Sequence, residues 1–141
     1  MRLSLAPPQY FWPREQTLAW YREALEWPLD IVHLGESVCS KRRELRLADW
    51  LALGDEFAAR GVEVVLSSLA LLEAESELSQ LRRLVANGRF KVEANDLSAV
   101  QLCRELGVLY IDTVVEPWAG FYFDAKADNA DRTNYALREA V

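Results

Sequence analysis

The chain has 141 residues, a length that suits one compact domain. Its 22 acidic residues outnumber the 16 Lys and Arg, and the net charge of −6 excludes the domain-wide positive field with which proteins hold nucleic acid. Hydrophobic residues make up 51% of the chain, enough to bury a core, yet no apolar run approaches the roughly 20 residues of a membrane helix. We therefore expect a soluble, cytoplasmic protein with no nucleic-acid partner and no membrane span.

Strand-like and helical patterns alternate along the sequence. The expected elements are a strand at 3–5, a helix at 14–27, a strand at 30–34, a helix at 47–60, a strand at 62–66, a helix from about 73 to the Asn87-Gly88 pair, a strand at 90–93, a helix at 97–106 and a strand at 108–115. Pro28 ends the first helix in this scheme, and Gly61 and Gly107 serve as C-terminal caps.

Strands joined by helical crossovers of this length must pair in parallel, so the fold class is α/β. The spacing predicts a partial (β/α) barrel of four to five parallel strand-helix units, with a small doubly wound sheet as the alternative. Half a barrel exposes two strand edges, and we expect a homo-oligomer to cover them. Past Pro117 we expect an irregular aromatic segment and a C-terminal helix at 131–141, which has no capping residue and suggests a truncated chain.

The two cysteines are far apart and form no C-x-x-C pair, which fits a reducing compartment. Cys39 follows a predicted strand, and the neighbouring basic run 41–43 would favour its thiolate. An inert loop cysteine is the alternative, since a metal centre needs three or four such ligands. Cys103 falls on the apolar face of its helix and is expected to fill the core.

Polar residues cluster where the fourth predicted strand ends. Asp96 is placed to cap the following helix, whereas Glu93 and Asn95 could act in acid-base chemistry or bind a ligand. The single histidine, His33, is expected to be an ordinary sheet residue. The sequence contains no G-x-G-x-x-G, P-loop or H-E-x-x-H motif.

Residues 1–102 resemble UbiV proteins of the collagenase-like peptidase family. The resemblance rests on FWPR at 11–14, DIVHLGESVCSKRREL at 30–45, VVLS at 64–67, LLE at 71–73 and VEANDL at 92–97. It implies a UbiU-like partner protein and oxygen-independent hydroxylation in ubiquinone biosynthesis. It also implies that Cys39 is the first of four ligands to a [4Fe-4S] cluster, which this chain alone could not assemble. Glu36, Glu93 and Asn95 are candidate substrate-binding residues.

Residues 103–141 resemble an internal segment of homospermidine synthase. The matching segments are LYIDTVVEPW at 109–118, GFYFD at 120–124 and RTNYALRE at 132–139. The resemblance implies an NAD-dependent enzyme that condenses putrescine units through imine chemistry, and it places Glu116 near the diamine and the nicotinamide. Because the glycine-rich turn is absent, we expect no NAD to bind.

The two resemblances divide the chain into a truncated UbiV-like half-barrel at 1–102 and a homospermidine-synthase-like strand and tail at 103–141. Our first functional expectation is a UbiV-like protein of ubiquinone biosynthesis that is inactive alone. The alternatives are a fragment of an NAD-dependent homospermidine synthase, or a non-catalytic remnant that binds a partner through an exposed sheet edge.

Overall fold

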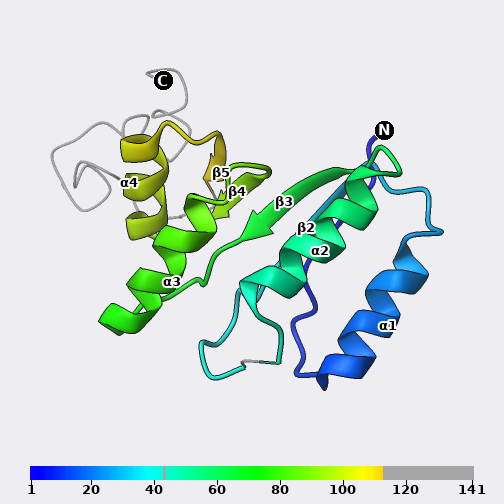
Figure 1. Ribbon diagram of the computed structural model, residues 1–141, viewed down its shortest axis with the longest axis horizontal. Coiled ribbons are helices and arrows are strands. Elements are labelled where there is room, and N and C mark those ends of the chain that lie inside the picture. The colour runs from blue at the N-terminus through cyan, green and yellow to red at the C-terminus, as the bar shows by residue number, and fades with distance from the viewer. Residues whose placement is uncertain (43, 113–141) are drawn as a thin grey trace, which may run out of the picture.

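The computed structural model describes residues 1–42 and 44–112. Strands and helices alternate throughout this part of the chain (Figure 1). The elements are β1 (Ser4–Leu5), α1 (Arg14–Ala24), β2 (Ile31–Leu34), α2 (Leu47–Ala58), β3 (Glu63–Ser67), α3 (Glu75–Val85), β4 (Lys91–Ala94), α4 (Leu97–Leu106) and β5 (Tyr110–Asp112).

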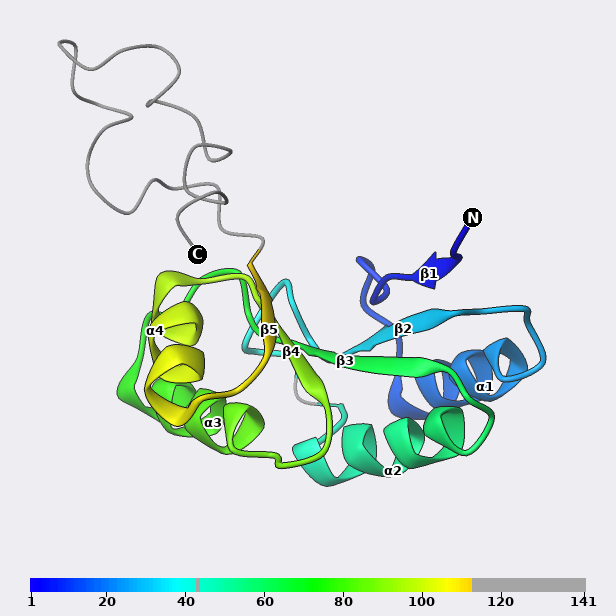
Figure 2. The same cartoon turned by 90° about the horizontal axis from the view of Figure 1, so that it is seen from above.

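The five strands form one parallel sheet with the order β1-β2-β3-β4-β5. The four helices of the described residues all lie on one face of this sheet (Figure 2). Right-handed crossovers that each return to the neighbouring position place successive helices on the same side. The predicted α/β class is therefore confirmed, with five parallel strands joined by four helices in the described residues. The predicted aromatic segment, the C-terminal helix and the last residues of the fifth predicted strand lie outside the described residues.

Local signals explain where the helices begin and end. The Asp96 carboxylate accepts a hydrogen bond from the Ser98 N–H at 2.7 Å, and Gly107 ends α4 with a φ of 65°, both as predicted. By contrast, α1 ends at Ala24, three residues early, because the N–H groups of Glu26 and Trp27 bond three residues back before Pro28. No helix in 1–42 or 44–112 is long and apolar enough to cross a membrane.

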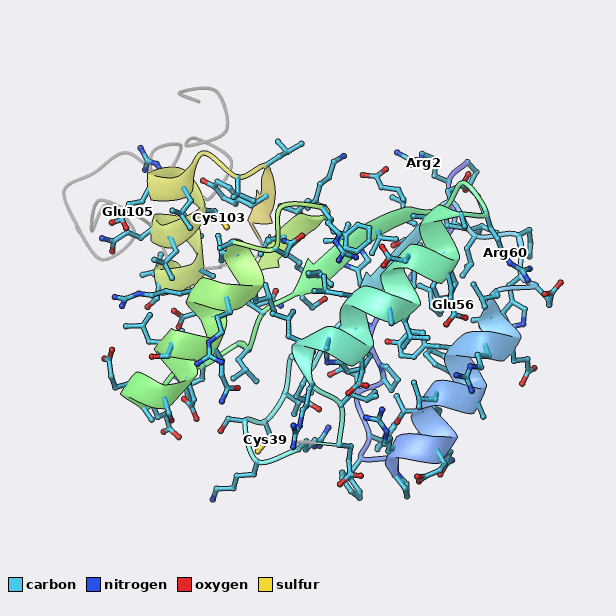
Figure 3. All side chains as sticks on the ribbon, viewed as in Figure 1. Arg2, Cys39, Glu56, Arg60, Cys103 and Glu105 are labelled. Atoms are coloured by element: carbon cyan, nitrogen blue, oxygen red, sulfur yellow. The ribbon has the colours of Figure 1, made fainter. Side chains whose placement is uncertain are left out.

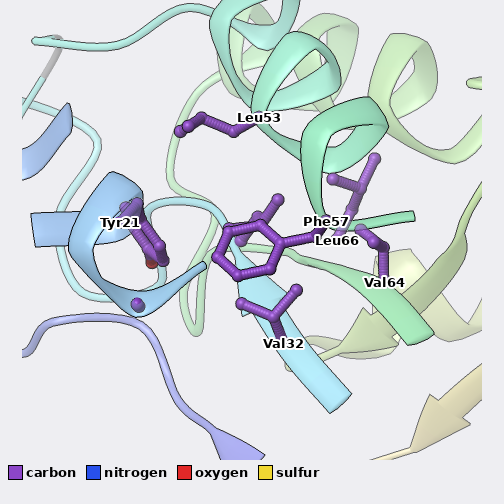
Figure 4. Close-up of a cluster of buried hydrophobic side chains, with 8 residues drawn as sticks. Tyr21, Val32, Leu53, Phe57, Val64 and Leu66 are labelled. Carbon is purple, nitrogen blue, oxygen red and sulfur yellow. The ribbon is translucent and has the colours of Figure 1, made fainter. Parts of the chain in front are cut away.

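Two hydrophobic clusters fill the space between the sheet and the helices. The first, which we call the aromatic cluster, contains Tyr21, Ala24, Val32, Leu34, Leu53, Phe57, Val64 and Leu66 (Figure 4). The second, which we call the aliphatic cluster, contains Leu81, Val85, Val92, Ala94, Ala99, Val100 and Cys103. The aromatic cluster joins α1 and α2 to β2 and β3, whereas the aliphatic cluster joins α3 and α4 to β4.

Strand register separates apolar from polar side chains. Val32, Val64 and Leu66 belong to the core, and Leu66 pairs with Val92 in the next strand. Residues one position along point to the opposite face, because side chains alternate along a strand. Ser67 thereby pairs with Glu93 on the face that carries no helices. Two further ion pairs join Glu63 to Arg2 and to Lys91.

Gly35 allows the loop after β2 to lie against the end of β3. Its φ is 145°, and a Cβ at this position would lie 2.5 Å from the carbonyl oxygen of Ser67. Both the backbone conformation and the close approach require glycine. The carboxyl ends of β2 and β3 are thus held together by a backbone contact.

Candidate functional site

Three side chains converge on one carboxylate oxygen at the carboxyl end of the sheet. The Ser67 hydroxyl donates a hydrogen bond to Glu93 Oε2 at 2.5 Å. The His33 Nδ1 atom lies 3.4 Å from the same oxygen, and Asn95 Nδ2 lies 3.5 Å from it. We call these four residues the Glu93 cluster. They come from β2, β3, β4 and the residue after β4, so the parallel register brings them together.

The surroundings of Glu93 favour its charged form. The neighbouring His33 imidazole lowers the pKa of the Glu93 carboxyl most strongly, and the Ser67 hydroxyl and the Asn95 amide lower it further. Burial acts in the opposite direction, but the pKa stays below its usual value. Glu93 is therefore a half-buried anion at neutral pH.

Backbone contacts fix the residues around this carboxylate. The Asn95 N–H donates to Ser68 Oγ at 2.9 Å, and its side-chain amide donates to the Ser68 carbonyl at 2.9 Å. The Tyr21 hydroxyl donates to the carbonyl oxygen of His33 at 3.3 Å. Burial raises the pKa of Tyr21, so this hydroxyl stays protonated and keeps the hydrogen bond. The cluster is pre-organised by groups outside it.

The geometry suits cation binding better than nucleophilic catalysis. Activation of a serine requires its hydroxyl to face an effective base, but the Ser67 hydroxyl donates to Glu93, whose lowered pKa makes it a weak base. His33 Nδ1 is buried and faces Glu93 Oε2 at 3.4 Å rather than the Ser67 hydroxyl, although the geometry falls short of a hydrogen bond. An ionised carboxylate at the open sheet face can instead accept hydrogen bonds from an ammonium group.

The other predicted site residues are not part of this cluster. The Glu36 Oε1 atom accepts hydrogen bonds from the N–H groups of Val38 and Cys39, at 2.8 and 3.1 Å, and so shapes the loop after β2. Cys39 lies on that loop, far from the buried Cys103 of α4 (Figure 3). Among the residues that the structure describes, no three His, Cys, Asp or Glu side chains are grouped to hold a metal ion. Glu116 lies outside the described residues.

Two members of the Glu93 cluster were missed by sequence reasoning. The expectation that His33 is an ordinary sheet residue is incomplete, because it faces Glu93, and no sequence motif points to Ser67. Strand alternation carries a signal for both, because Val32 and Leu34 are buried on one face and place His33 on the other. The register that pairs Ser67 with Glu93 is a property of the assembled sheet.

Comparisons with known proteins point to a dinucleotide-binding family. Residues 40–141 match the model of the saccharopine dehydrogenase NADP binding domain. The homospermidine synthase of Mesorhizobium japonicum is 74% identical over 50 residues, and that of Blastochloris viridis is 58% identical over 50 residues. Each alignment covers 36% of this chain, and the chain spans about a tenth of the length of these relatives. No solved structure matches.

These matches correct two expectations about cofactors. The expected [4Fe-4S] ligand role of Cys39 and the expected absence of NAD both conflict with a match to an NADP-binding family. The absence of a glycine-rich motif from this chain therefore does not exclude membership of a nucleotide-binding family. None of the matches supports the UbiV resemblance or its ubiquinone pathway, whereas the homospermidine synthase resemblance is confirmed.

The described residues do not themselves form a cradle for a dinucleotide pyrophosphate. The loops after β1, β2, β3 and β4 contain a single glycine, Gly35, whose close approach is to Ser67 and leaves no open turn. The strand order is sequential, so this part of the sheet has no reversal point of the kind at which doubly wound folds bind nucleotides. The open parallel sheet is nevertheless compatible with a domain of this class. Because the matched region covers more than half of the chain, the protein belongs to the family of saccharopine dehydrogenase NADP-binding domains.

Proposed function

We propose that this chain is part of a homospermidine synthase-like, NAD(P)-dependent enzyme of polyamine metabolism. The observation that carries the proposal is the 74% identity over 50 residues to the Mesorhizobium japonicum homospermidine synthase. Membership of an NADP-binding family supports the same class of chemistry. When bound, the nicotinamide would accept or donate a hydride, which no side chain of the chain can do.

The role proposed for this chain's own residues is to hold the cationic substrate. A polyamine carries several ammonium groups at neutral pH, and the chain has a net charge of −6. Glu93 is an ionised, half-buried carboxylate on the open face of the sheet. We propose that Glu93, with Asn95 beside it, holds one ammonium group, and that Glu116 is a further acidic contact.

A graft tests the assignment without requiring this chain to be active alone. Residues 103–141 would replace the equivalent residues of the Mesorhizobium japonicum enzyme, and homospermidine formation would be measured by chromatography. We expect the graft to keep most of the parent activity, because the segment would be functionally equivalent. A folded graft with no activity would contradict the proposal.

The same graft tests Glu116. The Glu116→Gln substitution removes the charge but keeps the size, and we expect at least a tenfold loss of kcat/KM, since a charged hydrogen bond contributes about 1.5–3 kcal/mol. Asp128→Asn is the matched control, as it removes one negative charge from the same segment. Equal losses in both variants would show a general charge effect and would refute a specific role for Glu116.

The Glu93 contact can be tested in the 141-residue chain by calorimetry with spermidine as the probe. Glu93→Gln should abolish measurable binding. Glu63→Gln is the control, because Glu63 is a strand carboxylate that already pairs with Arg2 and Lys91. If spermidine binds equally to both variants, attraction to the net charge explains the binding and the proposed contact fails.

A further inference from the structure

A large groove separates α2 from α3 on the helix-covered side of the sheet. Its volume is about 710 Å³, within the range of roughly 300–1,000 Å³ that small-molecule sites occupy. Figure 1 shows β3 passing between the two helices at this point. The aromatic cluster lies on one side of the groove and the aliphatic cluster on the other.

Much of the groove wall is apolar and only partly covered. Leu47, Trp50 and Leu51 line it from α2, and Leu84 lines it from α3. All four side chains retain contact with solvent, although they also pack against the hydrophobic clusters. When a ligand displaces water from apolar surface in a concave site, the free energy of binding becomes more favourable.

The charges that line the groove favour an anion. Arg83 of α3 lines the groove and forms no hydrogen bond or ion pair with any described residue. Arg46, just before α2, also lines the groove, and its charge helps to lower the pKa of the nearby Asp49 carboxyl. The two lining carboxylates already accept backbone hydrogen bonds. Glu36 accepts from the loop after β2, and Glu77 accepts from the N–H groups of residues 73 and 74.

We propose that this groove binds a small amphipathic anion, with a carboxylate or phosphate on an aliphatic or aromatic body. The apolar wall would contact the body, and Arg83 and Arg46 would bind the anionic group, since guanidinium matches the geometry of both oxyanions. The volume is that of a small-molecule site, which favours such a ligand over a helix of a partner protein. The groove shares Ser67 with the Glu93 cluster, but the Glu93 carboxylate itself does not line it.

Calorimetry with three probes of equal chain length tests the proposal on the 141-residue chain. Octanoate should bind at least tenfold more tightly than 1-octanol, and octylammonium should bind more weakly than either. Arg83→Gln should weaken octanoate binding by about tenfold, because one charged hydrogen bond is lost. Arg82→Gln is the matched control, since Arg82 is an exposed residue of the same helix outside the groove, and it should leave the affinity unchanged.

A second variant guards against an unfolded Arg83 mutant. Ala48 is an exposed groove residue of α2, and Ala48→Trp should fill the groove and block octanoate while the circular dichroism spectrum stays native. Equal affinity for octanoate and 1-octanol, or equal effects of the two arginine variants, would overturn the proposal. Saturating NADP⁺ should not displace octanoate, and displacement would assign the groove to the nucleotide instead.

Discussion

The aromatic and aliphatic clusters are built on the same repeat of strand and helix but with different side chains. In the aromatic cluster the ring of Tyr21 meets that of Phe57 edge-on, with 6.4 Å between the ring centroids. The Trp50 ring packs against the cluster in the same way, 5.8 Å from the Tyr21 centroid. The aliphatic cluster contains no ring among its fully buried members and relies on smaller side chains such as Val100 and Cys103. One backbone pattern therefore accepts two kinds of packing. We expect truncation of a buried side chain to lower the free energy of unfolding more in the aromatic cluster than in the aliphatic cluster.

Removal of Phe57 should have the largest effect. Phe57→Ala deletes a fully buried ring from the centre of the aromatic cluster, and we expect a loss of about 3–5 kcal/mol in the free energy of unfolding. Urea denaturation followed by tryptophan fluorescence and circular dichroism measures it. A loss below about 1 kcal/mol would mean that the cluster collapses around the gap.

Val100→Ala should lower the free energy of unfolding by less, about 2 kcal/mol, because it removes only two buried methyl groups. The neighbouring Cys103 provides a local readout. Burial raises the pKa of the Cys103 thiol to about 11, so it should react with a disulfide reagent only when the aliphatic cluster opens.

We expect Val100→Ala to accelerate the reaction of Cys103 and to leave that of the half-buried Cys39 unchanged. The rate of Cys103 reaction in Phe57→Ala, measured in the same assay, shows whether a defect in the aromatic cluster also exposes the aliphatic cluster. If both variants expose Cys103 in proportion to their global stability, the two clusters unfold together and are energetically one unit.

Asp96→Ala should cost about 1 kcal/mol, because it removes the side-chain acceptor for the Ser98 N–H at the start of α4. Asp96→Asn retains an oxygen acceptor and serves as the control. We expect the midpoint of thermal unfolding, measured by circular dichroism, to be lower for the alanine variant alone. Equal shifts would indicate that the charge of Asp96, rather than its cap, stabilises α4.

The smallest expected effect is a pH dependence of the free energy of unfolding, which arises from Asp49 in α2. The hydrogen bond from Arg14 lowers the pKa of Asp49 to about 2, and the backbone N–H of Arg46 contributes. Since the unfolded value is about 3.9, the carboxylate stabilises the fold above that pH, and this contribution is lost as the pH falls toward 2. Solvent screening keeps it small.

Urea midpoints at pH 5 and pH 3 would measure this effect. The difference between the two midpoints should be smaller in Asp49→Asn than in the unaltered chain. An unchanged difference would show that other carboxylates cause the acid sensitivity.

Local patterns predicted the order and type of the described elements, and α4 was predicted with its bounds, because Asp96 and Gly107 act within one turn of the helix. The candidate residues Glu93 and Asn95 do meet, since both follow from the end of one strand. His33 and Ser67 required the sheet register, and the groove required the separation of α2 from α3, which no local pattern encodes. The expectation that NAD does not bind was wrong, because a chain can match an NADP-binding family without containing its glycine-rich motif.

The sequential strand order has a consequence for folding. Within residues 1–42 and 44–112, each strand pairs with the strand that precedes or follows it along the chain, as Ser4 does with Ile31 and Val92 with Tyr110. Each pairing closes a single strand-helix crossover, so no strand has to wait for a segment more than one unit away along the chain. The sheet can therefore grow unit by unit in the order of synthesis, with each new strand adding to a template that already exists.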